Sequence, residues 1–545
     1  MTSLKKISQI IKHVFLDHRL DAGSEQERLS IEALRTRFQG TVVQQFPDVS
    51  QGGALIQGMW TVEKVALQLP LLLGFRMARY EPIVLLDAPY APLMDAYRVL
   101  GVEKFAFLSD HLPQNVPVEL ETLMDMAAEF GWRATEYKGL PVGVIAASSL
   151  MRKERYGKIY LTDEVHRSKY REILGEVLRY ADAACRLIDD VQPSMIGIND
   201  RGYSPIAQIF HRAMNLGINT ITMNGAHRNN YIMLKRYHPE NRWDHPSSLS
   251  HKSWQELLSQ SCSRDSAVYV LSEMEDCYRR AEWYGEVGTQ FHTHAVDAAD
   301  IRTRLNLATG KKVVGIFPHL FWDATFSWGE DIFDSYPDWF ESVLQIAATV
   351  EDVEWVVKVH PANRVKNTRD GYDGEYSEVL SLTRVLGDLP SHIHYIAAED
   401  DISTDSLLKV LDCCLTVRGT VGIEAACYGV TTYTAGTGRY DRHGFTIDSS
   451  NTAEYIQRIK GIANAPQMSG AQKERALLFA YGIFIERPTS LDIISTRYQM
   501  DGTASLEITV NANCGSDLST FNDVKSISKW INSGNDDYLA LQLVD

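Results

Sequence analysis

Polar residues that can perform acid–base chemistry or bind anions follow several predicted β-strands of this chain. The first such segment, VVKVHPAN, carries His360 and Pro361 directly after an apolar strand. A histidine at a strand end can donate a hydrogen bond to a phosphate or a ribose, and a proline fixes the turn. A lone histidine there is more often a structural turn residue. The assignment of His360 to a ligand site therefore depends on other candidate residues that would lie near it.

The second segment, LTVRGTVGIEAACYG, predicts a strand, a turn at Arg418, Gly419 and Thr420, and a helix opening near Val421. Backbone N–H groups and the Thr420 hydroxyl at a helix N-terminus form a ready anion site. Glu424, one turn into the helix, could bind ribose hydroxyls. The alternative is an ordinary strand–turn–helix junction that Thr420 caps. His360 and this turn together are far more specific than either alone.

Two earlier segments carry candidate catalytic residues. IGINDRGYSPIAQIF places Asp200 and Arg201 after a strand, and ITMNGAHRNNY places His227 and Arg228 after the next one. Asp200 could act as a base toward an acceptor hydroxyl or as a nucleophile toward an anomeric carbon. An ion pair with Arg201, or a helix N-cap, would explain Asp200 equally well.

A further segment, GIFPHLFWDATF, carries His319 and Asp323, which could line the floor of a cleft. No carboxylate pair has the placement of a metal site. Asp400 and Asp401 are adjacent, but they lie in a loop before a helix, which is typical of a cap or a solvated face. We therefore expect no required metal and no other cofactor.

Short β-branched runs alternate with longer helical patterns, which predicts parallel α/β sheets with helical crossovers. In such sheets ligands bind beyond the carboxyl ends of the strands. The predicted strands are Ile83–Leu86, Phe105–Leu108, Val142–Ala146, Met195–Ile198, Thr220–Met223, Val268–Leu271, Val313–Phe317, Trp355–Val359, Cys414–Val417 and Thr431–Thr434.

Breaks in this alternation suggest the domain boundaries. The main break falls where NLATGKK precedes a new strand. The predicted parts are an N-terminal helical extension (1–60), a first Rossmann-like domain (61–300), a second Rossmann-like, nucleotide-sugar-binding domain (301–465), a crossover helix (466–500) and a tail (501–545).

Composition excludes some classes of function. With 545 residues, 45% of them hydrophobic, and a net charge of -16, the chain is a poor candidate for nucleic-acid binding, because the phosphate backbone favours Lys and Arg.

The seven cysteines are best explained as free thiols in a reducing cytoplasm. The N-terminal 20 residues do not have the pattern of a signal peptide; they could form an amphipathic helix that contacts a membrane, although packing on the chain's own domain is the favoured interpretation.

The chain resembles the capsule polysaccharide biosynthesis group of bacterial glycosyltransferases, which includes retaining β-Kdo transferases. The resemblance rests on NDRGYSPIAQIF, NGAHRNNYIMLKR, FPHLFWDATF, KVHPAN and RGTVGIEAACYGVTTYTAGTGRYDRHGFT. It implies a GT-B fold, in which two Rossmann-like domains face across a cleft and a C-terminal helix crosses back to the first domain.

The resemblance also implies an activity. His360, Pro361, Gly419 and Thr420 would hold the phosphate of a nucleotide-activated sugar, with CMP-Kdo or a related CMP-sugar acid as the expected donor, and Glu424 would hold the ribose. Asp200 would be the base or nucleophile, while Arg201, His227 and Arg228 would hold the sugar. The acceptor would be a growing, lipid-linked surface polysaccharide (capsule, lipopolysaccharide or O-antigen) at the cytoplasmic face of the membrane.

Other functions fit the same pattern, because a fold does not fix a reaction. A UDP- or GDP-hexose transferase would use a different donor. A sugar-nucleotide epimerase would need no acceptor, and a CDP-polyol phosphotransferase would leave a phosphodiester in its product. A non-catalytic glycan-binding protein would bind nucleotides no better than background.

Overall fold

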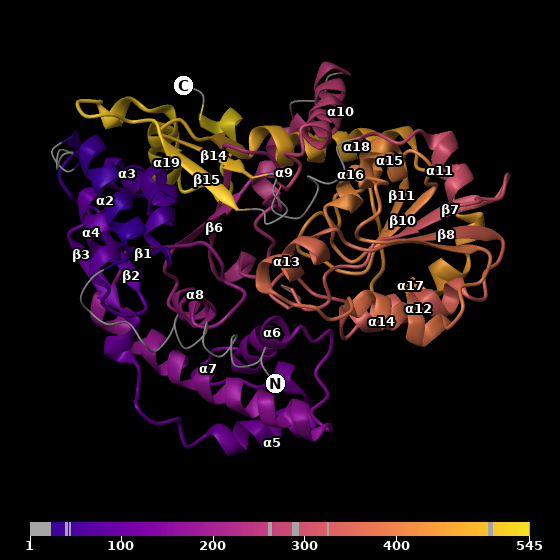
Figure 1. The fold of residues 1–545 in the computed structure, drawn as a ribbon, viewed down its shortest axis with the longest axis horizontal. Helices are drawn as coiled ribbons and strands as arrows, with labels where there is room; N and C mark the ends of the chain where they lie inside the picture. The colour runs from indigo at the N-terminus through magenta and orange to yellow at the C-terminus, as the bar shows by residue number, and fades with distance from the viewer. Residues whose placement is uncertain are drawn as a thin grey trace.

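The computed structural model describes residues 23–38, 42, 45–259, 264–285, 294–323, 326–499 and 505–543. It contains two large sheets side by side, and the chain visits the first, then the second, then the first again (Figure 1). The predicted α/β fold with two Rossmann-like sheets is thereby confirmed. The N-terminal segment predicted to contact a membrane lies outside the described residues, and no described helix combines the length and apolar character that crossing a bilayer requires.

The first sheet has the strand order β13-β6-β5-β4-β1-β2-β3. The strands from β5 to β3 run parallel, whereas β6 and β13 at one edge pair antiparallel. Their bounds are β1 (Gly53–Gln57), β2 (Glu81–Leu86), β3 (Lys104–Phe107), β4 (Met195–Ile198), β5 (Thr220–Gly225), β6 (Tyr231–Tyr237) and β13 (Pro488–Ser490).

Helices cover both faces of this sheet, as parallel strands buried on both sides require. One core forms with α2 (Glu25–Phe38), α3 (Leu69–Met77), α4 (Ala91–Val99) and α19 (Asn522–Ser533). The opposite core forms with α8 (Ile206–Asn215) and the C-terminal half of α7 (Glu164–Val191). The other half of α7 packs with α5 (Leu120–Phe130) and α6 (Val142–Glu154) in a helical region that projects from the sheet (Figure 1).

The second sheet is entirely parallel, in the order β12-β11-β10-β7-β8-β9. Its strands are β7 (Lys312–Ile316), β8 (Val353–Lys358), β9 (Ile393–Ile396), β10 (Cys413–Thr416), β11 (Thr431–Thr434) and β12 (Ile447–Asp448). One face carries α11 (Ala298–Arg304), α15 (Thr404–Leu408) and α16 (Val421–Tyr428); the other carries α12 (Tyr336–Ala347), α14 (Ser377–Leu386) and α17 (Thr452–Lys460) (Figure 1).

The chain then returns to the first sheet, as the predicted crossover requires. The helix α18 (Gly470–Tyr481) continues into a π-helical turn at Gly482–Glu486, and β13 then pairs with β6. The same region holds α9 (His251–Ser259) and α10 (Arg264–Arg279), and a small hairpin of β14 (Ile494–Tyr498) and β15 (Leu506–Val510) follows. Lastly, α13 (Ala362–Asp370) starts at the carboxyl end of β8.

Two predicted strands are wrong. Val142–Ala146 lies in α6, and Val268–Leu271 lies in α10. A short apolar run fits a buried strand or one stretch of a buried helix equally well, and these two runs continue into longer helices. The described cysteines Cys185, Cys277, Cys413, Cys414, Cys427 and Cys514 are free thiols.

The predicted N-terminal extension needs a correction. The sequence assigns 1–60 to a helical extension, but β1 lies within this segment and is a central strand of the first sheet. Its apolar core is only Ala-Leu-Ile, which is too short to stand out in the sequence. The tail likewise belongs to the first domain's core: α19 packs on α3 so closely that a Cβ at Gly74 would lie 2.5 Å from Ile527 Cγ2.

Candidate active site at the facing strand ends

Three turns of the second sheet meet at its carboxyl edge. His319 follows β7, His360 follows β8, and Gly419 and Thr420 follow β10; these three strands are neighbours in the order β10-β7-β8. The backbone N–H of Arg418 donates to His319 Nε2 at 3.3 Å, which ties the β7 turn to the β10 turn. The structure therefore brings together residues that are far apart in the sequence.

His360 is held as a hydrogen-bond donor. Its Nδ1 accepts the backbone N–H of Ala362 at 3.1 Å, so in the neutral imidazole the hydrogen sits on Nε2. Burial, with Lys366 and Lys358, lowers the pKa of His360 to about 4, so the ring is neutral near pH 7. Pro361 is the N-cap of α13 and fixes the turn. A neutral Nε2–H donor is suited to a phosphate or ribose oxygen.

The β10 turn is shaped for close approach to a ligand. A Cβ at Gly419 would lie 2.9 Å from Thr416 Oγ1 and 3.4 Å from His319 Cε1, so only glycine fits without movement. Thr420 is the N-cap residue of α16, but its side chain makes no capping hydrogen bond; its Oγ1 instead accepts from Arg439 Nη2 at 2.8 Å. The capping alternative for Thr420 is therefore not what the structure shows.

The Arg418 side chain holds this turn in place through hydrogen bonds to other loops. Its side chain is buried and binds Asp331, the Tyr336 hydroxyl at 3.3 Å and the Thr437 carbonyl at 3.1 Å. Arg439, which the sequence analysis did not single out, donates to the Arg418 carbonyl at 3.2 Å. The predicted donor-binding role of Arg418 is corrected to that of a positioning residue, because its guanidinium faces protein acceptors.

Glu424 is buried inside the molecule. Its carboxylate accepts the hydroxyl of Tyr278, on α10, at 2.8 Å. Burial raises the pKa of Glu424 to about 7. The predicted contact with a ribose would have to share this carboxylate with Tyr278.

Asp200 occupies the facing edge, at the end of β4 in the first sheet. It is exposed, and one carboxylate oxygen accepts the Gly202 N–H at 2.9 Å. Neither structural alternative holds for it: Pro205 is the N-cap of α8, and the Arg201 guanidinium is directed elsewhere. The pKa of Asp200 is raised because the surrounding protein desolvates the carboxylate.

Arg201 is part of the core rather than of the site. Its side chain is buried, with the guanidinium stacked against the rings of Phe210, Tyr237 and Trp328, and it donates to the Asp244 carbonyl at 2.6 Å. Arg201 therefore cannot hold the sugar as predicted, because its side chain has almost no exposed surface to offer a ligand.

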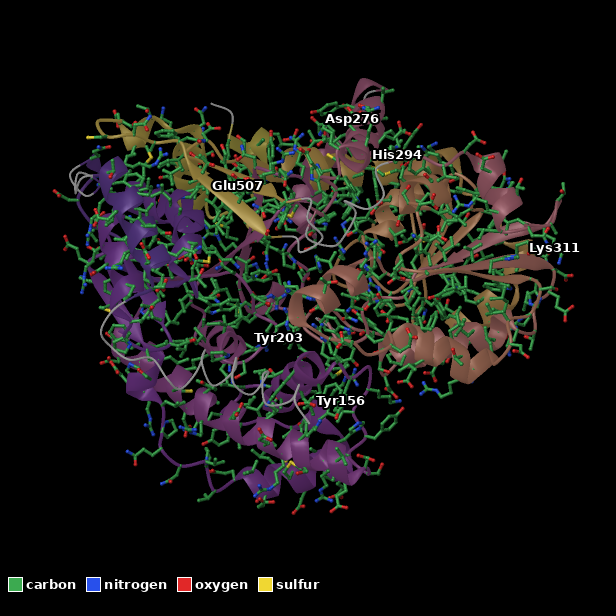
Figure 2. All side chains as sticks on the ribbon, viewed as in Figure 1. Tyr156, Tyr203, Asp276, His294, Lys311 and Glu507 are labelled. Carbon is green, nitrogen blue, oxygen red and sulfur yellow. The ribbon has the colours of Figure 1, made fainter. Side chains whose placement is uncertain are left out.

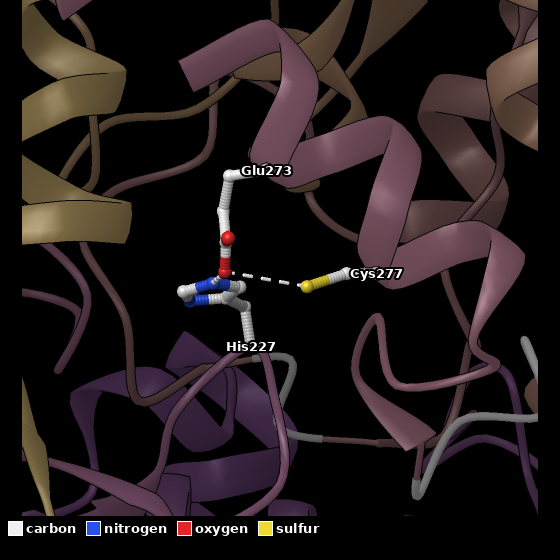
Figure 3. Close-up of side chains that lie close together, drawn as sticks. All are labelled: His227, Glu273 and Cys277. Atoms are coloured by element: carbon white, nitrogen blue, oxygen red, sulfur yellow. Dashed lines mark hydrogen bonds and ion pairs between the residues drawn. The ribbon is translucent and has the colours of Figure 1, made fainter. Parts of the chain in front are cut away.

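His227 and Arg228 likewise bind protein groups. Figure 3 shows His227 beside Glu273 and Cys277. His227 is fully buried, and its Nε2 lies 3.1 Å from Glu273 Oε1, which also accepts from Arg228 at 2.6 Å. The thiol of Cys277 donates to the same oxygen at 3.4 Å. His227 has no exposed surface left for a sugar, whereas Arg228 is partly exposed and its predicted contact with the sugar stays a prediction.

Among the described residues, His227, Glu273 and Cys277 also form a group with ligand atoms close enough for a metal ion. Burial and the neighbouring Glu273 raise the pKa of the Cys277 thiol above its usual value, and a metal would need the thiolate. Arg228 already neutralises the Glu273 carboxylate by an ion pair. The arrangement is that of a hydrogen-bonded cluster centred on one carboxylate.

Asp323 links the two edges. It accepts hydrogen bonds from Arg152 of α6 at 2.5 Å, from the Tyr203 hydroxyl at 2.7 Å and from Lys366 of α13. Tyr203 lies near the middle of the molecule, between the two sheets (Figure 2). Burial alone would raise the pKa of Asp323, but Lys366 and Arg152 hold it below its ordinary range.

The sequence motifs did not single out Arg152, Tyr203, Lys366 and Arg439 as site residues. Tyr203 and Arg439 stand in the quoted segments NDRGYS and TGRYDRHGF, and Lys366 follows HPAN by one helical turn. Their positions within or next to the candidate segments could have marked these three residues as site residues. The sequence offered no such signal for Arg152, because it stands on a helix that the sequence analysis takes for a strand and its flank.

A comparison with known protein families gives one match, over the second half of the chain. Residues 279–481 match the family of capsule polysaccharide biosynthesis proteins. This confirms the predicted resemblance, over a segment that contains the whole second sheet and α18. No functionally curated protein matches the chain.

Solved structures with a similar arrangement include two β-Kdo transferases named KpsC from Thermosulfurimonas dismutans. The 2,4-transferase is 13% identical over 58% of this chain and 84% of its own, with a TM-score of 0.31. The 2,7-transferase is 10% identical over 65% and 89%, also with a TM-score of 0.31. A UDP-GlcNAc 2-epimerase from Neisseria meningitidis is 11% identical over 79% and 96%, with a TM-score of 0.27.

Proposed function

We propose that this chain is a glycosyltransferase that moves a sugar from a nucleotide-activated donor to a growing surface polysaccharide, with CMP-Kdo or a related CMP-sugar acid as the leading donor. The family match supports the biosynthetic role. The observation that carries the proposal is the convergence of His319, His360 and the Gly419–Thr420 turn at one sheet edge.

The donor phosphate would bind at this edge. The first N–H groups of a helix lack intrahelical partners and carry partial positive charge, and α16 starts directly after Thr420. His360 adds a neutral donor at Nε2, and Lys366 adds a positive charge on the adjacent α13. Together these groups can stabilise the charge that develops on a departing nucleotide.

Two carboxyl groups with opposite pKa shifts define the catalytic side. Asp200 has a raised pKa and is exposed, which suits a proton acceptor for the attacking hydroxyl, or a nucleophile. Asp323 has a lowered pKa and stays ionised, so it holds Lys366, Arg152 and Tyr203 in place. We assign catalysis to Asp200 and positioning to Asp323.

No metal is required in this proposal, because helix N–H groups and Lys366 take the role of neutralising the phosphate. The lipid-linked acceptor and the location at the cytoplasmic face of the membrane are part of the same proposal. Nucleotide turnover that is unchanged by EDTA would support the metal-free mechanism, and loss of turnover that Mg²⁺ restores would contradict it.

The deciding experiment is calorimetric titration of the full chain with CMP, CDP, UDP and GDP. We expect a cytidine nucleotide to bind best and His360→Ala to weaken that binding by about tenfold or more, as loss of a hydrogen bond to a charged group does. His251→Ala, an exposed histidine on α9, is the matched control and should leave binding unchanged.

Each other outcome points to a different function. Preference for UDP or GDP would replace the donor with a hexose nucleotide; turnover of a nucleotide sugar without acceptor would indicate an epimerase. Transfer that leaves a phosphodiester in the product would indicate a CDP-polyol phosphotransferase. Absence of nucleotide binding would leave a non-catalytic glycan-binding protein. Unchanged affinity in His360→Ala would refute its phosphate role.

A further inference from the structure

Arg439 is a buried cation without an acidic partner. Only 8% of its surface is exposed, and it lies in the loop after β11, the strand next to β10. Its Nη1 donates to the Arg418 carbonyl at 3.2 Å and its Nη2 donates to the Thr420 hydroxyl at 2.8 Å, so both acceptors are neutral. Its Nε–H is buried without a partner, and no carboxylate of the described residues forms an ion pair with its guanidinium.

Two other basic side chains near the same sheet edge do have acidic partners. Arg418 binds Asp331, and Lys366 binds Asp323. Burying a charge costs free energy unless an opposite charge or a set of hydrogen bonds offsets the lost hydration. The positive charge of Arg439 therefore has no compensation within the described protein, and a bound anion would supply it.

The charge of Arg439 acts on two buried histidines nearby. Burial is the main reason that the pKa values of His245 and His319 lie well below the ordinary value. Arg439 comes next among the causes for His245, whereas Arg418, His360 and then Arg439 add to burial for His319. Both imidazoles are therefore neutral near pH 7, and an anion at this edge would be attracted by arginine rather than by a protonated histidine.

The Arg439 guanidinium lies at the N-terminus of α16. Thr420, whose hydroxyl accepts from it, is the N-cap residue of that eight-residue helix. The N–H groups of Thr420 and Val421 donate to no group of the described residues, and both residues are partly exposed. Free N–H groups at a helix N-terminus attract anions, and the helix dipole adds to that attraction. The arginine and the helix thus present positive charge at the same place.

The loop that carries Arg439 also occupies the carbonyl groups of the β10 turn. The Tyr440 hydroxyl donates to the Gly419 carbonyl at 2.8 Å, beside the bond from Arg439 to the Arg418 carbonyl. Two consecutive carbonyl oxygens, which would repel an anion, are thereby bound to the protein. The polar backbone groups of the turn that remain for a ligand are N–H groups.

From these contacts we propose that Arg439 binds the phosphate of the donor and supplies the buried positive charge of that site. The inference rests on the proposed function and adds a phosphate-binding residue that lies outside the His360–Pro361 and Gly419–Thr420 motifs. A phosphate at this turn would offset the charge of Arg439 and accept from the free N–H groups of Thr420 and Val421.

Calorimetric titration of the full chain with inorganic phosphate and with CMP, at an ionic strength matched with sodium chloride, tests the inference. We expect Arg439→Gln to weaken the binding of both probes by about tenfold or more, as loss of a hydrogen bond to a charged group does. Arg439→Lys keeps the charge and should lose less affinity. Arg442→Gln is the matched control: its side chain is 81% exposed in the same loop, and it should bind both probes like the wild type.

Thermal unfolding separates phosphate binding from a purely structural role, because Arg439→Gln also removes hydrogen bonds of the turn. A ligand that binds only the folded state stabilises it. Phosphate should therefore raise the melting temperature of the wild type and of Arg442→Gln more than chloride does, and should have a smaller effect on Arg439→Gln. A lower melting temperature of Arg439→Gln with unchanged phosphate affinity would overturn the inference. So would a wild type that phosphate stabilises no better than chloride, which needs no variant to test.

The choice of probes also separates this inference from the proposed function. Phosphate binding that depends on Arg439, in a protein that binds no nucleotide, would sink the donor proposal alone. CMP that binds Arg439→Gln as tightly as the wild type would overturn the role of Arg439 and leave the donor proposal standing. Loss of binding of the methyl glycoside of Kdo in Arg439→Gln, with unchanged phosphate affinity, would assign the charge to a sugar carboxylate and overturn the phosphate role.

Discussion

At the scale of single residues, burial and charge drive two carboxyl groups in opposite directions. At Asp200 desolvation outweighs the opposing charge of Arg152, and the pKa rises. Asp323 is also desolvated but contacts Lys366 and Arg152, and its pKa falls. Asp200 is thus suited to proton transfer, whereas Asp323 stays ionised.

Asp200→Asn should keep nucleotide affinity and lower turnover by roughly 100-fold or more, because general-base catalysis contributes about that much. Since only the ionised form accepts a proton, wild-type turnover should decline on acidification at a pH above the ordinary carboxyl pKa. Release of free nucleotide from the donor, measured across pH, checks both effects. Asp189→Asn, an exposed carboxylate on α7, is the control. A normal rate in Asp200→Asn would remove Asp200 from the mechanism.

At the scale of elements, the turns around the site are built from close backbone contacts. Gly329 has φ near +70°, and a Cβ there would overlap the Thr437 carbonyl oxygen. Its N–H donates to the Trp243 carbonyl of the first domain at 2.6 Å, and the Gly438 carbonyl accepts the His245 N–H at 2.7 Å. These turns connect the two domains and also brace Arg418.

Gly329→Ala should therefore lower the free energy of unfolding by about 2–5 kcal/mol, from a left-handed backbone and a backbone overlap together. Gly371→Ala is the matched control: its φ is +64°, but a Cβ there meets nothing within 4 Å. That variant should lose only about 1 kcal/mol. Urea unfolding of the two variants measures the difference, and equal losses would show that the contact at Gly329 relaxes.

At the scale of the whole molecule, the C-terminal segment stabilises the first domain through a buried carboxylate. Asp537 is fully buried; its carboxylate lies 2.9 Å from Lys235 Nζ and 3.6 Å from Arg487 Nη1, and it accepts the Ser250 N–H at 2.6 Å. These partners belong to β6, the segment after α18 and the loop before α9. One carboxylate thereby joins four distant parts of the chain.

Asp537→Asn should cost roughly 3–5 kcal/mol of unfolding free energy, because it leaves two buried cations without their counter-charge. Lys235 and Arg487 outweigh burial and hold the pKa of Asp537 below its usual range. The stabilisation is therefore complete above the unfolded pKa of about 3.9 and is lost as the pH falls through the folded value. Denaturant unfolding at several pH values should show the two proteins converging on acidification. Asp536→Asn, at a partly exposed neighbour, should change little, and an equal effect there would argue against the buried pair.

The sequence alone determined the α/β class and the position of most strands of both sheets, because alternating apolar runs and helical periods are local properties. It also pointed to His360, Gly419, Thr420 and Asp200, because the rule that ligands bind after strands needs only the strand ends.

Only the tertiary structure decided where the other side chains point. Arg201 stands beside Asp200 in the sequence, yet its guanidinium stacks among three aromatic rings, while Arg152, from a different helix, reaches Asp323. Lys235 and Asp537 pair across 302 residues. The physical reason is that a buried charge goes to the partner that best offsets its desolvation, and that partner is supplied by the packing of distant segments, which no local pattern records.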